Sequence, residues 1–307
     1  MRASVIAAVA TAALGLGALA PAPALAWNGQ GHMATGDIAY DDLAARDPKA
    51  VAAIVALMRD HPDRAAFDRQ LAGLTGRARE RRLFALMARW PDDTRGSAYD
   101  RPDWHYEVKV VSPWRFVMPL AFGDAERAFR DNLAIARDPK ARRADRAVAL
   151  CWIMHQVGDQ HQPLHAGHWM SWKFPKTDRA GTIAYVRWTP GGASVDLHEF
   201  WDGVPNRAGG LDAGSEALAA AAEAAHPRPS GGGLGPDPYR AFLAWERESW
   251  ILAKTVAYRD GALATGRTRA EAPVLPKGYW ATARDLADLR IATAGYRLAD
   301  VLALVRL

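Results

Sequence analysis

Cysteine is almost absent from this sequence: Cys151 is the only one among 307 residues. An intramolecular disulfide is therefore excluded, and a metal site built from several thiolates is excluded with it. The protein must be held together by packing or by a metal with other ligands. Cys151 itself is predicted to be a small core residue.

Features that would divide or anchor the chain are also missing. Beyond residue 26 no stretch is long and apolar enough to span a membrane. The sequence has no internal repeat and no break in composition, so residues 27–307 are expected to form a single domain. The formal net charge of +5 permits a phosphate-bearing partner but does not identify one.

Residues 1–26 have the pattern of a secretory signal peptide. Arg2 supplies the positive start, residues 5–19 form an apolar run, and residues 24–26 read Ala-Leu-Ala, a small-x-small cleavage site. An uncleaved membrane anchor is the alternative, although the apolar run is short for one. Cleavage would make Trp27 the new amino terminus. The protein would then be secreted or periplasmic, with no membrane attachment.

Helical periodicity dominates the rest of the chain, without the alternation of strands and helices that builds a parallel sheet. Apolar residues at helical spacing begin near Ile38 and continue past Pro48 to Met58, and Leu83–Met87 belong to a helix that runs into residues 90–95. Further helices are predicted at Gly123–Arg137, Ala213–Ala225, Pro238–Tyr258 and Gly278–Val305, with an extended segment at residues 104–111 and a hairpin through residues 182–189. The predicted fold class is mainly α.

The stretch from Cys151 to His165 concentrates metal-binding side chains in one helix and its exit. His155 and Asp159 are four residues apart, so both lie on one face of a helix, and Pro163 ends that helix before His165. His198 and Asp202 repeat the same offset. A single pair of this kind is more often a surface ion pair. Two pairs with a further histidine favour zinc or a similar divalent metal.

Several motifs together resemble the secreted zinc-dependent nucleases of the fungal S-one and P-one type, which have plant and bacterial relatives. These enzymes degrade single-stranded nucleic acid and act as 3′-nucleotidases. The motifs follow the family order: Trp27 to His32; Trp90, Asp92 and Arg95; Trp104, His105 and Tyr106; His155, Gly158, Asp159, Gln162, Pro163 and His165; and Leu197, His198, Trp201 and Asp202. Trp245 with Glu248-Ser249 and residues 294–299 also resemble the family, so the match covers nearly the whole chain after residue 26.

The resemblance implies a helical fold around a cluster of three zinc ions, of the type shared with phospholipase C. The implied ligands of the first ion are Asp92, His105, His155 and Asp159; of the second Trp27, His32 and the bridging Asp159; and of the third His165, His198 and Asp202. Trp27 would coordinate through its free amino nitrogen and its carbonyl oxygen. Signal cleavage would therefore complete the cluster.

The implied reaction is hydrolysis of a phosphate ester that leaves 5′-phosphates, with Asp92, Arg95 and Asp159 as the catalytic residues. Arg95 would stabilise charge on phosphorus and contact the substrate, or else would only hold Asp92 by an ion pair. Tyr106 would stack on a base, or else would belong to the core. The implied partners are single-stranded DNA or RNA and 3′-nucleotides, and the protein is expected to be a monomer.

The chain departs from the family pattern near the expected substrate site. Val108 occupies a position where the family often has a residue that hydrogen-bonds the base. The family also tends to have Gly-Gly-Asn shortly before the last His-Asp helix, where this chain has Gly191-Gly192-Ala193. The loop before it carries residues that would stack, attract phosphates or merely pack: Trp169, Trp172, Lys173, Lys176 and Trp188. Four histidines, at positions 61, 161, 168 and 226, are expected at the surface or behind the ligands.

Two other functions compete with the nuclease. A zinc-dependent phospholipase C shares the amino-terminal Trp and the three zinc ions. It typically has Glu in place of Asp202, and a longer gap than the one from Trp27 to His32. An exported zinc-binding or nucleic-acid-binding protein without turnover is the other alternative, but none of the implied ligands is missing.

Overall fold

The structure is a computed structural model that describes residues 27–114, 120–230 and 234–305. The predicted signal peptide, residues 1–26, lies outside these described residues. The fold is mainly helical, with 61% helix and 7% strand, which confirms the predicted fold class. No helix in the described ranges is long and apolar enough to cross a membrane.

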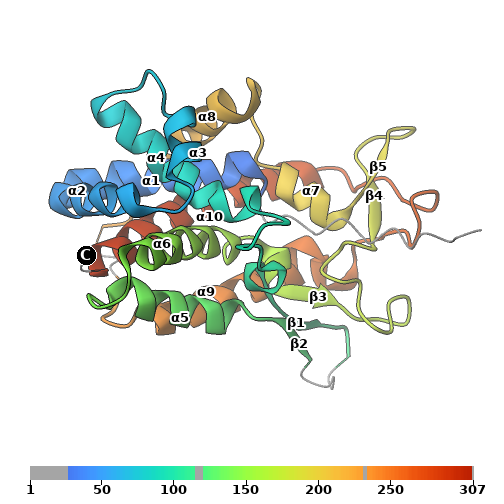
Figure 1. Ribbon diagram of the computed structural model, residues 1–307. Helices are drawn as coiled ribbons and strands as arrows, with labels where there is room; N and C mark the ends of the chain where they lie inside the picture. The colour runs from blue at the N-terminus through green and yellow to red at the C-terminus, as the bar shows by residue number, and fades with distance from the viewer. Residues whose placement is uncertain (1–26, 115–119, 231–233, 306–307) are drawn as a thin grey trace, which may run out of the picture.

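The helices are arranged side by side along the molecule, and the strands lie together at one end (Figure 1). The helices are α1 (Gly29–Arg46), α2 (Pro48–Leu57), α3 (Arg64–Gln70), α4 (Gly76–Asp93), α5 (Ala125–Arg137), α6 (Arg143–Asp159), α7 (Leu197–Gly203), α8 (Gly210–Ala225), α9 (Pro238–Leu252) and α10 (Tyr279–Leu304). The strands are β1 (Glu107–Val111), β2 (Ala121–Gly123), β3 (Gly167–Trp169), β4 (Tyr185–Arg187) and β5 (Ser194–Asp196).

Helix α1 is central, because α4, α8 and α10 all pack against it. Two glycines allow this close approach. A Cβ added at Gly36 would lie 2.5 Å from the carbonyl oxygen of Phe84 on α4, and one added at Gly295 of α10 would lie 2.5 Å from Ile38. The backbones of these helices can therefore meet only where no side chain intervenes.

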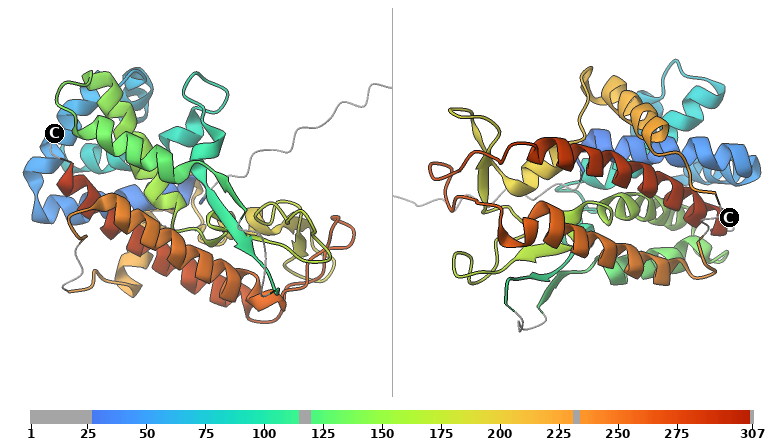
Figure 2. Two further views of the ribbon diagram at one scale, coloured as in Figure 1. Left: turned by 90° about the horizontal axis from the view of Figure 1, so that it is seen from below. Right: turned by 180° about the vertical axis from the view of Figure 1, so that it is seen from behind.

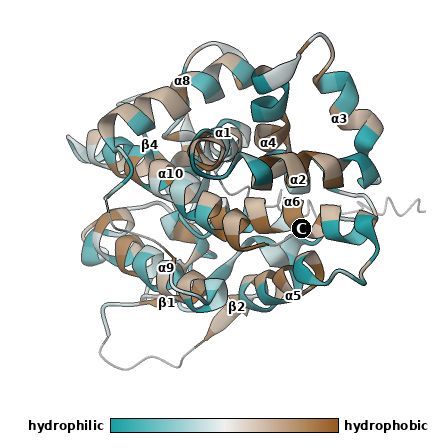
Figure 3. Ribbon diagram, turned by 90° about the vertical axis from the view of Figure 1, so that its left-hand side faces the viewer, coloured by the Kyte–Doolittle hydropathy of each residue, from teal (hydrophilic) through white to brown (hydrophobic). Residues whose placement is uncertain are grey.

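The core lies between the helices. In Figure 3 the outer helix α3 is largely polar. Most buried apolar residues of α4 and α6 belong to one core cluster, which includes Cys151. Cys151 is fully buried, as predicted. Helices α9 and α10 run alongside each other (Figure 2), joined by Glu248, which pairs with Arg290 at 3.0 Å and Arg297 at 2.6 Å.

The strands form two small sheets. Strand β1 pairs antiparallel with β2 and parallel with β3, and β4 pairs antiparallel with β5. The prediction of an extended segment at residues 104–111 is right only from Glu107 onward, because Pro102–His105 forms a 3₁₀ turn with Pro102 in its first turn.

The hairpin was predicted too early in the chain. Strand β4 begins at Tyr185 and returns as β5 after a turn that contains Gly191, whose φ of 74° favours glycine. Three predicted helices are found with small shifts at their ends. The segment Pro238–Tyr258 is α9 followed by a π-helical turn at Ala253–Ala257.

Candidate metal centre

Histidines and aspartates from six segments meet at the end of the bundle that faces the strands. Helix α1 contributes His32, the end of α4 Asp92, and the 3₁₀ turn before β1 His105. The last turn of α6 supplies His155 and Asp159, and the turn Pro163–His165 and helix α7 supply His165, His198 and Asp202. They form three groups, each able to hold a metal ion: His32, Asp92 and His155; His105, His155 and Asp159; and His165, His198 and Asp202.

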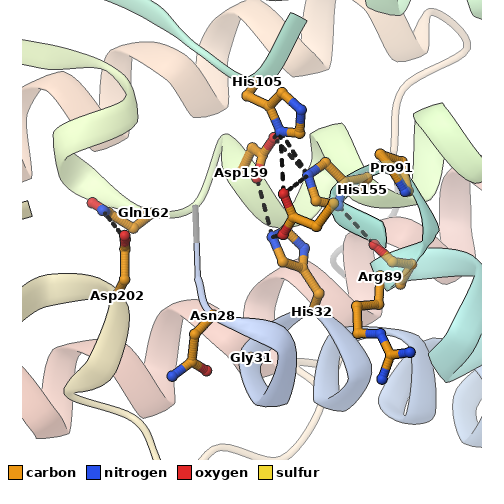
Figure 4. A network of polar contacts seen from close by, with 12 residues as sticks. Asn28, Gly31, His32, Arg89, Pro91, His105, His155, Asp159, Gln162 and Asp202 are labelled. Atoms are coloured by element: carbon orange, nitrogen blue, oxygen red, sulfur yellow. Dashed lines mark hydrogen bonds and ion pairs between the residues drawn. The ribbon is translucent and has the colours of Figure 1, made fainter. Parts of the chain in front are cut away.

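The first two groups share one centre (Figure 4). Nε2 of His155 lies 2.8 Å from Nδ1 of His105. The Oδ2 atom of Asp159 lies 3.3 Å from each of these nitrogens, whereas its Oδ1 atom lies 3.3 Å from Nε2 of His32. The two oxygens of Asp159 therefore face different histidines, which is the arrangement of a bridging carboxylate.

His32 and Asp92 close the other side of this centre. The His32 ring stacks on His155 with centroids 3.8 Å apart, and Oδ2 of Asp92 lies 3.8 Å from Nε2 of His32. The stacking requires a small residue beside His32, since a Cβ added at Gly158 would lie 2.9 Å from its Nδ1 atom. Gly158 thus lets α6 carry two candidate ligands directly against α1.

The third group lies on the turn after α6 and on α7. Nε2 of His165 is 3.1 Å from Nε2 of His198, which is 3.7 Å from Oδ2 of Asp202. Gln162 donates from its side-chain amide to Oδ1 of Asp202 at 2.8 Å. This hydrogen bond leaves the Oδ2 atom of Asp202 free to face the histidines.

Backbone carbonyls orient three of the histidines. Nδ1 of His155 donates to the carbonyl oxygen of Ala88 at 2.8 Å. In the same way, Nδ1 of His165 donates to the carbonyl oxygen of His105 at 2.7 Å, and Nδ1 of His198 to that of Ala180 at 2.7 Å. A proton on Nδ1 leaves Nε2 with a lone pair directed at the centre. Two such lone pairs facing each other repel unless a cation lies between them.

Several atoms in the centre are buried without a hydrogen-bond partner among the described residues. They include both carboxylate oxygens of Asp159 and both ring nitrogens of His32. Burial raises the pKa of Asp159 well above its ordinary value and lowers the pKa of His32 and of His105 well below theirs. The imidazoles are therefore neutral, which is the form that binds metals. A bound cation would supply the positive charge that stabilises Asp159 as a carboxylate. The residues present fit divalent metal ions.

Trp27 is fully buried at the start of the described chain. The backbone beside it is held by the Asn28 amide, which donates to the carbonyl oxygen of Asp202 at 3.3 Å. In Figure 4 the chain next to Asn28 rises between Asp202 on one side and Asp159 and His32 on the other. Trp27 directly precedes Asn28, so its backbone lies next to that of Asp202. Its role as a metal ligand stays a prediction.

Arg95 and Tyr106 line a cavity of 430 Å³ that also reaches His165 and His198. Nη2 of Arg95 donates to Oδ1 of Asp92 at 2.9 Å, so both roles considered for this arginine are open to it. Tyr106 is half-buried, its hydroxyl donates to Asp103 at 3.0 Å, and Val108 lies in the same wall. This cavity is the candidate substrate site.

The structure separates the candidate residues of the 166–193 loop. Of the five named in the sequence analysis only Lys176 lines the cavity. Trp169 packs against Tyr258 and Trp188 against Phe200, with ring centroids 5.5 and 4.9 Å apart, while Trp172 is 88% exposed. Gly191–Ala193, which stand in place of the family's Gly-Gly-Asn stretch, do not line the cavity.

Other functional candidates were missed by sequence reasoning. Phe122, Thr177, Arg179 and Thr182 line the cavity, and no motif or periodicity singles them out. Three of the histidines that were expected at the surface or behind the ligands, His61, His161 and His168, are buried, so the surface alternative does not hold for them. None of the three belongs to the candidate metal groups within the described ranges.

Comparison with known proteins supports the same assignment. A family model described as S1/P1 nuclease matches residues 27–306, nearly the whole chain. A search of curated proteins found no match. The match extends over every element that contributes to the metal centre and the cavity. The chain therefore belongs to the S1/P1 nuclease family, whose members are phosphodiester hydrolases.

Proposed function

We propose that this nuclease is a zinc-dependent endonuclease that hydrolyses single-stranded DNA and RNA to 5′-phosphate products and also removes phosphate from 3′-nucleotides. The observation that carries the proposal is the position of the cavity. It opens onto the third ligand group through His165 and His198, and it is lined by Arg95 and Tyr106. A phosphate at the ligands and a base against the tyrosine would occupy one continuous space.

Three zinc ions would be held by the proposed ligands. Asp92, His105, His155 and Asp159 would hold the first, Trp27, His32 and Asp159 the second, and His165, His198 and Asp202 the third. Imidazole and carboxylate without thiolate are what zinc takes in catalytic sites. When bound, these ions would lower the pKa of a shared water towards about 7 and offset charge on the leaving 3′ oxygen.

The protein's own residues then position the substrate. Asp159 would bridge two ions and Asp92 would complete their ligands, while Arg95 directs charged donors to the phosphate from its place beside Asp92. Tyr106 offers a ring face to a base, a contact that tolerates many sequences. Val108 offers no hydrogen bond to a base edge, so base selectivity at this wall should be weak.

Export and activation would be one event. Removal of residues 1–26 as a signal peptide would expose the amino nitrogen of Trp27, which an uncut chain presents only as an amide. The mature protein, residues 27–307, would be a monomer in the periplasm or the medium.

The charge of the cavity distinguishes this proposal from a phospholipase C. Among the described residues the lining includes Arg95, Lys176 and Arg179 and no aspartate or glutamate. Such a lining attracts a phosphodiester strand and repels a quaternary ammonium headgroup, which is itself a cation.

The test compares three substrates with the zinc-loaded, processed protein. We expect release of phosphate from adenosine 3′-monophosphate and of short 5′-phosphorylated products from single-stranded DNA, with no hydrolysis of phosphatidylcholine. Turnover of the phospholipid alone would support the rival enzyme. Zinc binding with no turnover of any substrate would support a binding protein without catalysis.

A further inference from the structure

The cavity carries positive charge that the metal centre does not use. Lys176 and Arg179 line it, both exposed, and within the described chain neither side chain makes an ion pair or a hydrogen bond. Arg95, by contrast, is paired with Asp92. Two unpaired cations beside a cavity without carboxylates form a site for an anion.

The segment that carries them, Lys176–Thr182, is held in a fixed conformation. Thr177, Arg179 and Ala180 have φ angles of 78°, 54° and 57°, in the left-handed region that residues other than glycine rarely adopt. Such backbone persists only where its surroundings over-determine it, and it gathers at ligand sites. The surroundings of this segment must therefore supply strong anchors.

Two anchors fix the segment from inside. Asp178 is fully buried and accepts hydrogen bonds from the amide of Trp169 at 2.8 Å and the hydroxyl of Tyr258 at 3.2 Å. The carbonyl oxygen of Ala180 accepts from Nδ1 of His198 at 2.7 Å. Arg179 lies between these two residues in the chain, so its backbone is fixed relative to a proposed metal ligand.

The size of the cavity limits what the second anion can be. Its 430 Å³ falls in the lower part of the range of about 300–1,000 Å³ for small-ligand pockets, enough for one nucleotide. If the 3′-phosphate of that nucleotide lies at His165 and His198, the second phosphate that a nucleotide of a 3′–5′ linked strand carries is on its 5′ carbon. The 5′-phosphate is therefore the anion that Lys176 and Arg179 can reach within one bound nucleotide.

We propose that Lys176 and Arg179 form a second phosphate subsite, which binds the 5′-phosphate of the nucleoside whose 3′ ester is hydrolysed. The proposal rests on the proposed function and adds a substrate preference to it. A nucleoside with phosphates on both positions, or an internal nucleotide of a strand, is a better substrate than one with a 3′-phosphate alone.

The experiment compares adenosine 3′-monophosphate with adenosine 3′,5′-bisphosphate, which differ only in the 5′-phosphate. Phosphate release gives kcat/KM for each substrate with the zinc-loaded, processed protein and with the double variant Lys176→Gln, Arg179→Gln. We expect the wild type to prefer the bisphosphate, and the double variant to reduce the ratio of the two kcat/KM values about tenfold, mainly through KM. On a single-stranded oligonucleotide the slope of log kcat/KM against log salt should fall by about 0.7 for each lost contact.

Three controls separate charge at this subsite from other effects. Glutamine has the same backbone preferences as lysine and arginine, so the strained φ at residue 179 is unchanged. Lys173→Gln removes a charge from the same loop but outside the cavity lining, and it should keep the wild-type ratio. The single variant Arg179→Lys keeps both positive charges, because Lys176 is unchanged. It should therefore retain most of the wild-type preference for the bisphosphate.

The outcomes are distinct. If the wild type hydrolyses both substrates but the double variant keeps the wild-type ratio, the subsite is wrong and the proposed function stands. A ratio lowered equally by Lys173→Gln would show a general effect of net charge and would also overturn the subsite. If the wild type releases phosphate from neither substrate, both the subsite and the proposed function fail.

Discussion

Asp159 is the candidate ligand that connects the first two groups of the candidate metal centre. Each of its oxygens faces a different histidine at 3.3 Å, and it is buried without any hydrogen-bond donor among the described residues. A carboxylate in that position is stable only beside cations. No other described side chain contacts the histidines of both groups through separate oxygens at that distance.

Replacing Asp159 by Asn should remove metal and activity together. The amide keeps the shape of the side chain but loses the charge and one of the two acceptor oxygens. We expect kcat/KM on 3′-nucleotides to fall by about 100-fold or more, since even residues behind the ligands of metal sites cost 10- to 100-fold when changed. Asp285→Asn, at an exposed position on α10, is the matched control. Full metal content with unchanged turnover in the Asp159 variant would refute the bridging role.

Tyr106 lies in the wall of the cavity, where its ring face is the proposed contact for a base. Tyr106→Ala should raise KM on short oligonucleotides about tenfold, because a base stacked on an aromatic ring contributes about 1–3 kcal/mol. Tyr106→Phe keeps the ring and loses only the hydrogen bond to Asp103, so its KM should stay near the wild-type value. Equal effects of the two substitutions would indicate a role for the hydroxyl and argue against stacking.

Sequence reasoning identified residues in patterned positions and missed residues placed by tertiary structure. His155 and Asp159 were found because a helix brings residues four apart to one face. Arg179 was missed, since its place in the cavity depends on left-handed backbone and on the hydrogen bonds that Asp178 accepts from Trp169 and Tyr258. No local pattern of residue types encodes such a conformation.

At the scale of elements, α1 links the chain start to the metal centre. Asn28 caps this helix by accepting from the amide of Gln30 at 3.2 Å, and the helix brings His32 over His155. The close packing of α1 on α4 and α10 fixes its position along the bundle. The backbone of Trp27 is thereby fixed beside Asp202 and His32.

Extending the chain by a single residue before Trp27 should weaken the centre. The extension converts the amino nitrogen of Trp27 to an amide, which does not coordinate as an amine does. We expect lower metal content and a loss of activity of about tenfold or more relative to a chain that starts at Trp27, a loss in the range seen for changes at metal sites. The circular dichroism of the two chains should be the same, because only the terminus differs. Equal metal content and activity would show that Trp27 is not a ligand.

The type of each element could be predicted better than its limits. Helices were found from apolar spacing, but the hairpin was placed too early because β4 and β5 have only three residues each, too few for an alternating pattern to fix their limits. The 3₁₀ turn at His105 was missed since its residues fit an extended pattern equally well. Short elements have too few residues for periodicity to decide.

At the scale of the whole molecule, buried histidines away from the metal centre should make the fold sensitive to acid. Burial lowers the pKa of His61 to about 4, while its ring packs edge-on against Trp90 with centroids 4.7 Å apart. The unfolded chain takes up the proton near pH 6.5, but the folded protein does so only near pH 4. Stability is therefore highest above pH 6.5 and falls as the pH drops through this window.

His61→Gln should reduce that dependence on pH. The free energy of unfolding of the wild type, measured with urea at pH 7 and pH 4.5, should fall by about 2 kcal/mol more than that of the variant. The comparison uses the change between the two pH values, so any loss of packing in the variant cancels. The same fall in both proteins would mean that His61 takes up its proton at the same pH in the folded protein as in the unfolded chain.

The central claim is that this S1/P1 nuclease holds a zinc cluster and uses it on nucleotides. The most direct test is elemental metal analysis of the protein processed to Trp27, with phosphate release from a 3′-nucleotide measured on the same sample. The account predicts close to three zinc ions per chain, one for each ligand group, together with nucleotide hydrolysis that a chelator abolishes. Little zinc, or hydrolysis that persists after the metal is removed, would contradict it.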